Sequence, residues 1–235
     1  MSQFDPTNFT ILVVEDHKFS RQALISMLVR SGYENLLSAK DGEEAIMKCD
    51  QNKIDLIITD INMPKVNGIE LIKAVRMNQT NSSHHTNIIA VTTLSDTNTI
   101  SACMTLEVDA FLVKPISIKC AQEKIQAAVS ELKHLYQQHL YETVDTQISL
   151  SSQHEPDQNE AKIRQIQSQV HELSALSELR AGMTLVHDIK AHNGGCLIKA
   201  GTQLNKKLIK RLFELSSIID IDTIYVRVDQ KQIAV

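Results

Sequence analysis

Acidic, hydroxyl and basic side chains follow the apolar runs in the first half of the chain. Glu15 and Asp16 follow the first run, Asp60 ends the third, Thr92 ends the fourth and Lys114 follows the fifth. Three carboxylates that converge repel one another, so a bound cation would stabilise them, and hard oxygen ligands with room for water favour Mg²⁺ over zinc. A lysine beside them can neutralise a bound anion. These residue types indicate metal-assisted transfer of an anionic group.

Short β-branched runs alternate with longer amphipathic stretches, which is the pattern of a parallel sheet with helices on both faces. We predict strands at residues 10–14, 35–39, 56–60, 87–92 and 110–113. Ligands of such open sheets bind at the carboxyl ends of the strands. The predicted fold class is therefore α/β, a doubly wound five-stranded parallel sheet whose carboxyl edge gathers the polar residues.

Phosphoryl transfer asks a protein mainly for positioning and for neutralisation of charge. Asp60 is the candidate nucleophile and phosphoacceptor. We expect Mg²⁺ to be held by Asp16, by Asp60 and by the backbone carbonyl of Asn62, with Glu15 acting through water.

The remaining polar positions would bind the transferred group. Thr92 would donate its hydroxyl to one phosphoryl oxygen, and Lys114 would pair with another. The aspartyl phosphate formed on Asp60 is an activated anhydride, which water eventually removes. We therefore expect phosphoacceptor chemistry and slow autodephosphorylation at Asp60, and no further enzyme activity.

These segments resemble the receiver domain of two-component response regulators. The resemblance covers about residues 10–129 and rests on Val13-Val14-Glu15-Asp16, Asp60-Ile61-Asn62-Met63-Pro64, Asn67-Gly68, Ile88-Ile89-Ala90-Val91-Thr92 and Phe111-Leu112-Val113-Lys114-Pro115. It implies a flavodoxin-like fold and phosphorylation of Asp60 by a sensor histidine kinase or a phosphotransfer protein. It also implies a cis Lys114-Pro115 bond and a switch in which Thr92 moves toward the phosphoryl group while Phe111 turns inward. A receiver that has lost phosphorylation is the alternative, and the intact set of residues argues against it.

The helix predicted after Pro115 carries an apolar seam that continues past the receiver. Apolar residues recur at steps of three and four, at Ile118, Ala121, Ile125, Ala128, Leu132 and Leu135, with a shifted set at Val129, Tyr136, Leu140 and Val144. A repeat of about 3.5 residues is a coiled-coil signal. The seam predicts a parallel homodimer through this connector helix or, alternatively, a contact within the same chain.

A polar stretch and a second apolar stripe follow the connector helix. Residues 146–160 are polar, with Ser, Gln, His154 and Pro156 and little to bury, and this composition predicts a flexible linker. The stripe at Ile163, Ile166, Val170, Leu173, Leu176 and Leu179 predicts a second helix that needs a partner. We therefore assign residues 1–130 to the receiver and residues 131–180 to a helical connector with the polar linker near 146–160.

Residues 181–235 form the predicted output or interaction module, a small α+β unit. Residues 185–189 and 196–199 flank His192-Asn193-Gly194-Gly195, which is a hairpin signal. Asn205 can cap a helix, and residues 223–228 predict a closing strand. The module weakly resembles the small module that accompanies HD-GYP-type phosphohydrolases. The metal-binding clusters of the hydrolase are absent from the sequence, and we interpret His187-Asp188 as chance adjacency.

The basic cluster Lys206, Lys207, Lys210 and Arg211 raises the alternative of a DNA-binding transcriptional regulator. No second helix at turn-helix spacing and no interleaved aromatic residue accompanies it, so a solvated helix face is favoured and nucleic acid is not the expected partner. A cyclic-dinucleotide-binding regulator without hydrolase activity is a further alternative. Our main interpretation is a non-enzymatic module that binds an unidentified output protein.

Composition narrows the class of protein. The formal net charge of −4 in 235 residues argues against a chain coated in positive charge. The four cysteines lie far apart, which predicts neither a disulfide framework nor a zinc site and suggests a reducing, cytoplasmic setting. The apolar run at residues 9–14 is too short for a signal peptide or a membrane span.

Overall fold

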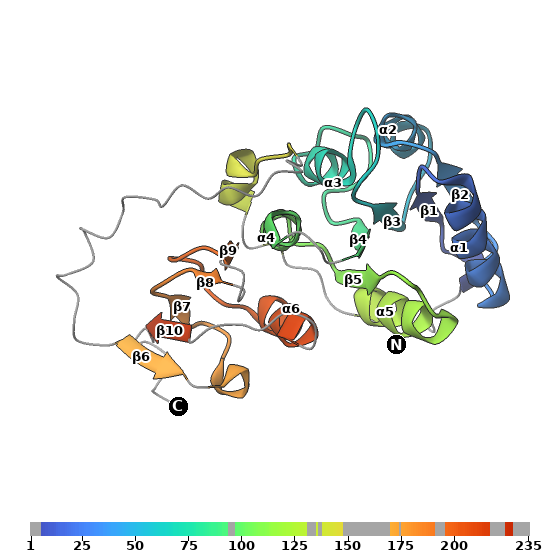
Figure 1. Cartoon of the computed structure of the whole chain (residues 1–235). Helices are drawn as coiled ribbons and strands as arrows, with labels where there is room; N and C mark the ends of the chain where they lie inside the picture. The colour runs from blue at the N-terminus through green and yellow to red at the C-terminus, as the bar shows by residue number, and fades with distance from the viewer. Residues whose placement is uncertain are drawn as a thin grey trace. The chain divides into compact units, whose positions relative to one another are not determined.

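The computed structural model of the chain describes residues 6–93, 97–130, 135, 138–147, 170–173, 175–190, 196–216 and 224–227. The chain forms two compact units, residues 1–146 and 147–235 (Figure 1).

The first unit contains a five-stranded parallel sheet in the order β2-β1-β3-β4-β5. The strands are β1 (Ile11–Val14), β2 (Leu36–Ala39), β3 (Leu56–Asp60), β4 (Asn87–Thr92) and β5 (Ala110–Val113). The predicted doubly wound sheet is confirmed, and only β1 and β2 begin one residue later than predicted. The strand order reverses between β1 and β3, which is where folds of this kind bind their ligands.

Helices cover both faces of this sheet (Figure 1). They are α1 (Lys18–Arg30), α2 (Gly42–Gln51), α3 (Gly68–Arg76), α4 (Thr97–Thr105) and α5 (Ile118–Ser130), after a short 3-10 helix, η1 (Pro6–Asn8). Helices α1 and α5 pack on one face of the sheet, while α2, α3 and α4 lie next to one another on the other. Asp41 caps α2, and Asn67 forms a capping box with Glu70 at the start of α3.

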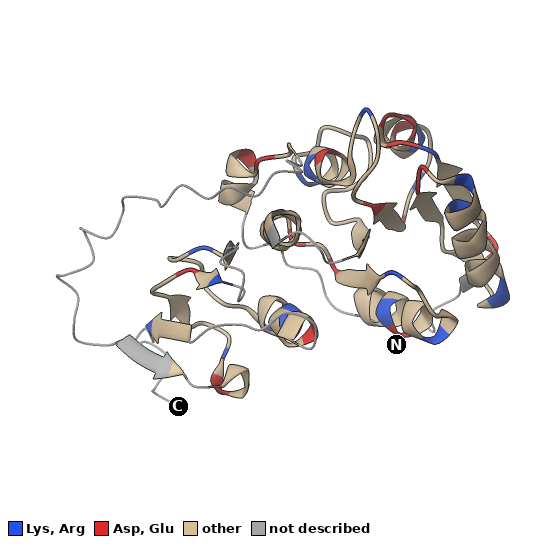
Figure 2. Cartoon of the chain, in the orientation of Figure 1, with Lys and Arg blue, Asp and Glu red and all other residues tan. Residues whose placement is uncertain are grey.

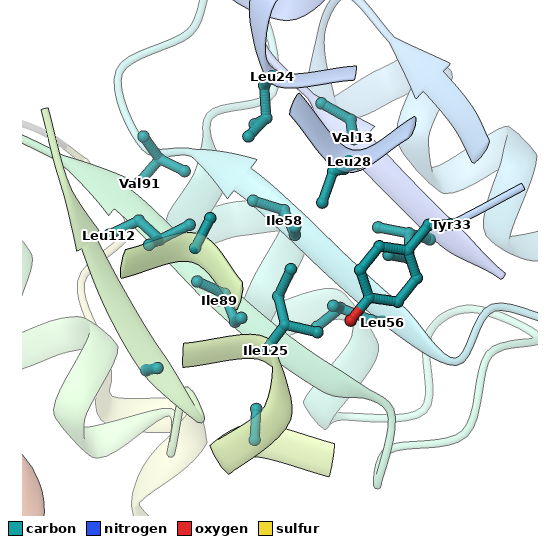
Figure 3. Close-up of a cluster of buried hydrophobic side chains, with 14 residues drawn as sticks. Val13, Leu24, Leu28, Tyr33, Leu56, Ile58, Ile89, Val91, Leu112 and Ile125 are labelled. Atoms are coloured by element: carbon teal, nitrogen blue, oxygen red, sulfur yellow. The ribbon is translucent and has the colours of Figure 1, made fainter. Parts of the chain in front are cut away.

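Alternate strand residues build the core beneath α1 and α5 (Figure 3). Ile58 and Ile89 come from the central strands, and Leu28 and Ile125 from the helices above them, and all four are fully buried. Since the neighbouring strand residues are buried on the opposite face, the strands read as continuous apolar runs in the sequence. This core holds the carboxyl ends of the strands in fixed positions.

The seam after α5 does not form the predicted long helix. Helix α5 ends at Ser130, and residues Gln138–Thr143 form a 3-10 helix, η2, within the first unit. Tyr141 and Val144 are buried there. The prediction of a coiled-coil helix that continues through Val144 is therefore wrong. For Tyr141 and Val144, the structure shows the alternative, a contact within the same chain. The seam positions 132 and 136 lie outside the described residues.

The second unit contains two small antiparallel sheets and one helix. A three-stranded sheet has the order β6-β10-β7, formed by Val170–Leu173, Ile224–Arg227 and Thr184–Leu185, and a hairpin pairs β8 (Ile189–Lys190) with β9 (Cys196–Ile198). Helix α6 (Lys206–Ser216) begins after Asn205, whose side chain accepts a hydrogen bond from the backbone N–H of Leu208 at 2.8 Å. The predicted cap and closing strand are therefore confirmed. The predicted hairpin is confirmed only in part, because residues 189–190 pair with β9 while Leu185 pairs with β10 in the other sheet. The hairpin loop 191–195 lies outside the described residues.

Two expectations for this part of the chain are wrong. Residues Val170–Leu173 form strand β6 and not a helix, because pairing with β10 satisfies their backbone groups across the sheet. The 3-10 turn η4 (Leu176–Glu178) follows, and residues 163–169 and 174 of the predicted helix lie outside the described residues. Arg211 is buried rather than part of a solvated basic face, so the exposed cations of α6 are reduced to its lysines.

Within the described residues, no helix combines the length and hydropathy needed to cross a bilayer.

A buried arginine connects α3 to the loops at the amino-terminal edge of the sheet. The Arg76 side chain is fully buried and forms an ion pair with Asp109 at 3.3 Å. Its guanidinium also donates hydrogen bonds to the backbone carbonyl oxygens of Leu106, His84, Thr86 and Glu107. This one side chain therefore satisfies acceptors from two separate stretches of the chain, residues 84–86 and 106–109.

We expect Arg76→Met to lower the free energy of unfolding by about 3–5 kcal/mol, because it removes the buried partner of a buried charge. Urea denaturation of the full chain measures the change. Lys119→Met is the matched control, since the Lys119 side chain is 87% exposed on α5, and its effect should stay within about 0.5 kcal/mol. Equal losses in the two variants would contradict the structural role of Arg76.

Candidate functional site at the carboxyl edge of the sheet

The predicted acidic cluster forms where β1 and β3 end, and the tip of β3 is marked as acidic in Figure 2. Carboxylate oxygens of Glu15, Asp16 and Asp60 lie within 4.8 Å of one another. The Lys114 ammonium donates hydrogen bonds to Asp60 Oδ2 at 3.0 Å and to Glu15 Oε2 at 2.9 Å. The backbone N–H of Ile61 donates to Asp60 Oδ1 at 2.9 Å. Both oxygens of Asp60 are therefore fixed in direction.

This donor set fits a hard divalent cation. Glu15 and Asp60 are buried, whereas Asp16 is exposed, so an ion could reach the cluster and keep part of its water shell. Asn62 lies in the exposed loop after Asp60. Sequence reasoning missed Arg21 on α1, which donates hydrogen bonds to the backbone carbonyls of Glu15 and Asp16 at 2.6 and 3.2 Å and so holds the acidic loop. Only its position one turn into the helix could have signalled this.

Burial and charge act in opposite directions on the protonation of the site. Burial raises the pKa of Asp60, and the hydrogen bond and charge of Lys114 offset only part of that rise. Burial favours the neutral amine of Lys114, yet its hydrogen bonds to Glu15 and Asp60 raise the pKa of Lys114 above its ordinary value. Lys114 therefore stays charged and serves as the counterion of the buried carboxylates.

Thr92 and Phe111 occupy the neighbouring strands. Thr92 ends β4 beside Asp60, whose strand partner is Val91, and its backbone carbonyl accepts a hydrogen bond from the Lys114 N–H at 3.0 Å. Phe111 is buried in β5, and the Lys114-Pro115 peptide bond is cis. The structure thus gathers Glu15, Asp16, Asp60 and Lys114 directly, and it places Thr92 at the adjacent strand end.

Two glycines allow the loop after Asp60 to lie close to its neighbours. A Cβ atom at Gly68 would lie 2.3 Å from the backbone oxygen of Asp60, and the Gly68 N–H donates to the carbonyl of Ile61 at 2.9 Å. A Cβ atom at Gly42 would lie 2.4 Å from the backbone oxygen of Val66. The residues between Asp60 and Gly68 are therefore packed against the starts of both α2 and α3.

Lys65 clamps the same loop to α2. Its Nζ lies 2.8 Å from Asp41 Oδ2 and 3.2 Å from Glu43 Oε2, and its backbone adopts a positive φ of 66°. Asp41 also accepts a hydrogen bond from the backbone N–H of Glu44 at 2.9 Å. Sequence reasoning missed this clamp, because residues 41 and 65 come together only when the loop folds over α2.

Comparison with known proteins identifies the family of the first unit. Residues 11–129 match the model of the response regulator receiver domain. Chemotaxis protein CheY1 of Helicobacter pylori is 34% identical over 120 residues, which are 51% of this chain and 95% of that protein. Transcriptional regulatory protein PdtaR of Mycobacterium tuberculosis is 31% identical over 53% of this chain and 58% of its own length. A solved structure of chemotaxis response regulator CheY4 of Vibrio cholerae is 32% identical, covers 52% of this chain and 99% of its own, and has a TM-score of 0.47.

The chain belongs to the response regulator receiver domain family, and its first unit is a receiver domain of a two-component system. The family match ends at residue 129 and does not bear on the second unit. The resemblance of residues 181–235 to the module of HD-GYP-type regulators therefore stays a prediction.

The clamp at Asp41 makes a stability prediction with a defined pH dependence. The hydrogen bonds from Lys65 and from the Glu44 N–H lower the pKa of Asp41 in the folded protein. A lowered pKa stabilises the fold above the unfolded-state value of about 3.9, and this contribution is lost as the pH falls through the folded-state pKa. Asp41→Asn should therefore be less stable than the native chain near pH 7, and the difference should shrink below about pH 4.

Urea unfolding at about pH 7, 5 and 3.5 measures this difference across the titration range. Glu123→Gln is the control, because the Glu123 side chain is 66% exposed and its nearest cation is 3.9 Å away. Its stability should follow that of the native chain at each pH. A deficit of Asp41→Asn that is constant with pH would show that the charge of Asp41 does not contribute.

Proposed function

We propose that the receiver accepts a phosphoryl group on Asp60 from a sensor histidine kinase or a phosphotransfer protein, with Mg²⁺ bound at Asp16, Asp60 and the Asn62 carbonyl. The observation that carries the proposal is the cluster of three carboxylates within 4.8 Å, with the Lys114 ammonium on two of them. Glu15 would act on the ion through water. This arrangement supplies both a nucleophilic oxygen and positive charge for an incoming phosphoryl group.

In the transfer, a carboxylate oxygen of Asp60 forms the new P–O bond while the P–N bond to the donor histidine breaks. The electron pair of that bond stays on the imidazole, which takes up a proton. Lys114 moves from the Asp60 carboxylate to a phosphoryl oxygen, and Thr92 donates its hydroxyl to another. Bound Mg²⁺ would neutralise negative charge on the phosphoryl oxygens. Water later cleaves the acyl phosphate and releases inorganic phosphate.

The phosphoryl group would shift the receiver between two conformations. Thr92 would move toward the phosphoryl oxygens and leave space between β4 and β5. Phe111, which is already buried in this structure, would turn further inward into that space. Helix α4, β5 and α5 would carry the change to a partner surface, because the group binds one arrangement of these elements better than the other.

The second unit is the proposed output module, which binds a protein partner and has no enzyme activity of its own. We propose a cytoplasmic setting, which the four widely spaced cysteines of the sequence favour. The burial of Arg211 removes one of the four cations that favoured DNA as the alternative partner. Homodimerisation stays a prediction for the seam on α5, since Tyr141 and Val144 pack within their own unit.

Intact-mass spectrometry after incubation with acetyl phosphate and Mg²⁺ tests the phosphoacceptor. We expect one added phosphoryl group on the native chain and none on Asp60→Asn. Asp55→Asn is the matched control, because Asp55 precedes the same strand at the opposite edge of the sheet, and it should be modified like the native chain. An equal addition to Asp60→Asn would show that another residue is the acceptor.

Lys114 should contribute to the rate of modification. Lys114→Ala removes the side-chain cation that contacts Asp60, and loss of one such charge-stabilising donor costs about 10²-fold in rate. The rate of mass gain at fixed acetyl phosphate and Mg²⁺ measures the effect. Lys53→Ala, a change at a side chain that is 91% exposed, should keep the native rate. Equal rates for the two variants would remove Lys114 from the proposed mechanism.

A further inference from the structure

Residues 138–147, called here the docked segment, span the end of the first unit at residue 146, and η2 packs beside α3. Tyr141 is 2% exposed, and its hydroxyl donates a hydrogen bond to Glu107 Oε2 at 2.6 Å. Lys73 on α3 donates from Nζ to the backbone carbonyls of Glu142 at 3.1 Å and Val144 at 2.8 Å. The segment is therefore held by the buried Tyr141 side chain and by the hydrogen bonds that Lys73 donates to its backbone carbonyls.

The docked segment has a defined direction along α3. Its first anchor, Glu107, follows α4 at the amino-terminal edge of the sheet, and its middle anchor, Lys73, lies within α3. Its last anchor is Asn67, the N-cap of α3, whose Nδ2 donates to the backbone carbonyl of Thr146 at 2.8 Å. The chain thus runs antiparallel to α3 and leaves the receiver at the edge that carries the acidic site.

Asn67 takes part in both the N-cap of α3 and the binding of the docked segment. Its Oδ1 accepts a hydrogen bond from the Glu70 N–H at 3.0 Å, which caps α3, while its Nδ2 holds Thr146. The loop that starts at Asp60 ends at Asn67, and the next residue, Gly68, donates its N–H to Ile61. A displacement of the loop between Asp60 and Gly68 therefore moves the group that binds the docked segment.

We propose that occupancy of the acidic site is coupled through Asn67 to docking of the outer end of the segment, residues 145–147. The coupling deepens the proposed function and rests on it where phosphorylation is the input. The loop must adapt when a phosphoryl group joins Asp60, and its movement breaks the hydrogen bond from Asn67 to Thr146. The buried Tyr141 anchor keeps the inner end in place. Release of the outer end lengthens the chain that tethers the second unit.

Hydrogen exchange of the full chain, read by mass spectrometry with the intact mass of the same sample, tests the coupling. After modification with acetyl phosphate and Mg²⁺, the amides of residues 145–147 should exchange about fivefold faster, because loss of the hydrogen bond to the Thr146 carbonyl makes local opening of this stretch easier by the strength of one ordinary hydrogen bond. The amides of residues 141–144 should be unchanged. A fully modified sample with unchanged exchange at 145–147 would overturn the coupling and leave the proposed function standing.

Asn67→Asp isolates the donor, because aspartate keeps the oxygen that caps α3 and loses the N–H₂ group that holds Thr146. We expect residues 145–147 of this variant to exchange about fivefold faster without modification and to change no further with it. Asn81→Asp is the matched control, since Asn81 Nδ2 donates to the Asp50 carbonyl at 3.2 Å, away from the docked segment. Native-like exchange at 145–147 in Asn67→Asp would overturn the proposal.

Lys73→Met separates this proposal from the failure of phosphorylation. Coupling is reciprocal, so weakening the docked segment should loosen the loop. We expect faster exchange at residues 61–68 of Lys73→Met than of the native chain, with no phosphodonor present. If the native chain gains no mass, the proposed function fails, and the coupling is judged on this result alone. Native exchange at residues 61–68 in Lys73→Met would overturn it.

Discussion

The receiver depends on like charges held together at one edge of a sheet. Glu15 and Asp60 are buried carboxylates in the same cluster, and their repulsion would drive them apart or protonate them without a counterion. Lys114 supplies the positive charge from a third strand. The attraction is strong because the carboxylates are buried, and it can be redirected because Lys114 is itself partly exposed. A site of this kind responds readily to an added anion or cation.

The rest of the first unit maintains this geometry. Burial of the strands on both faces fixes the positions of their carboxyl ends, while Gly42 and Gly68 let the connecting loop approach the starts of two helices. Lys65 and Asp41 then hold the loop from the side of α2. At the opposite edge, Arg76 joins α3 to the turns around β4 and β5. The site is therefore a set of loops held on a rigid sheet, with clamps that lie outside the reacting groups.

The sequence predicts the sheet and the acidic site well, for a physical reason. A strand buried on both faces must be apolar along its length, so the runs that became β3, β4 and β5 could be read directly. Parallel strands end at the same edge, and this placed Asp60 and Lys114 together before any contact was known. Lys65 with Asp41, and Tyr141 with Glu107, could not be found in this way, because each pair is separated by a fold of the chain that no local pattern encodes.

The two wrong helices have a common cause. An apolar repeat of three and four residues shows that a face needs a partner, but it does not show whether the partner is a second chain, the same domain or a strand. Tyr141 packs within the receiver, where its ring is buried and its hydroxyl donates a hydrogen bond to Glu107. Val170–Leu173 pairs as a strand with β10. In both cases long-range pairing overrode the local pattern.

The docked segment changes how a signal can leave this receiver. A connector helix that continued from α5 would report on β5 and α5 alone, since it would extend the same rigid element. In the structure, Tyr141 instead contacts Glu107, and the segment follows α3 to Asn67, which holds Thr146. The hydrogen bond that holds Thr146 therefore comes from the loop that begins at the proposed phosphoacceptor, Asp60. Because one side chain both caps α3 and holds the chain that leads to the second unit, small loop movements reach that unit's tether without a rearrangement of the core.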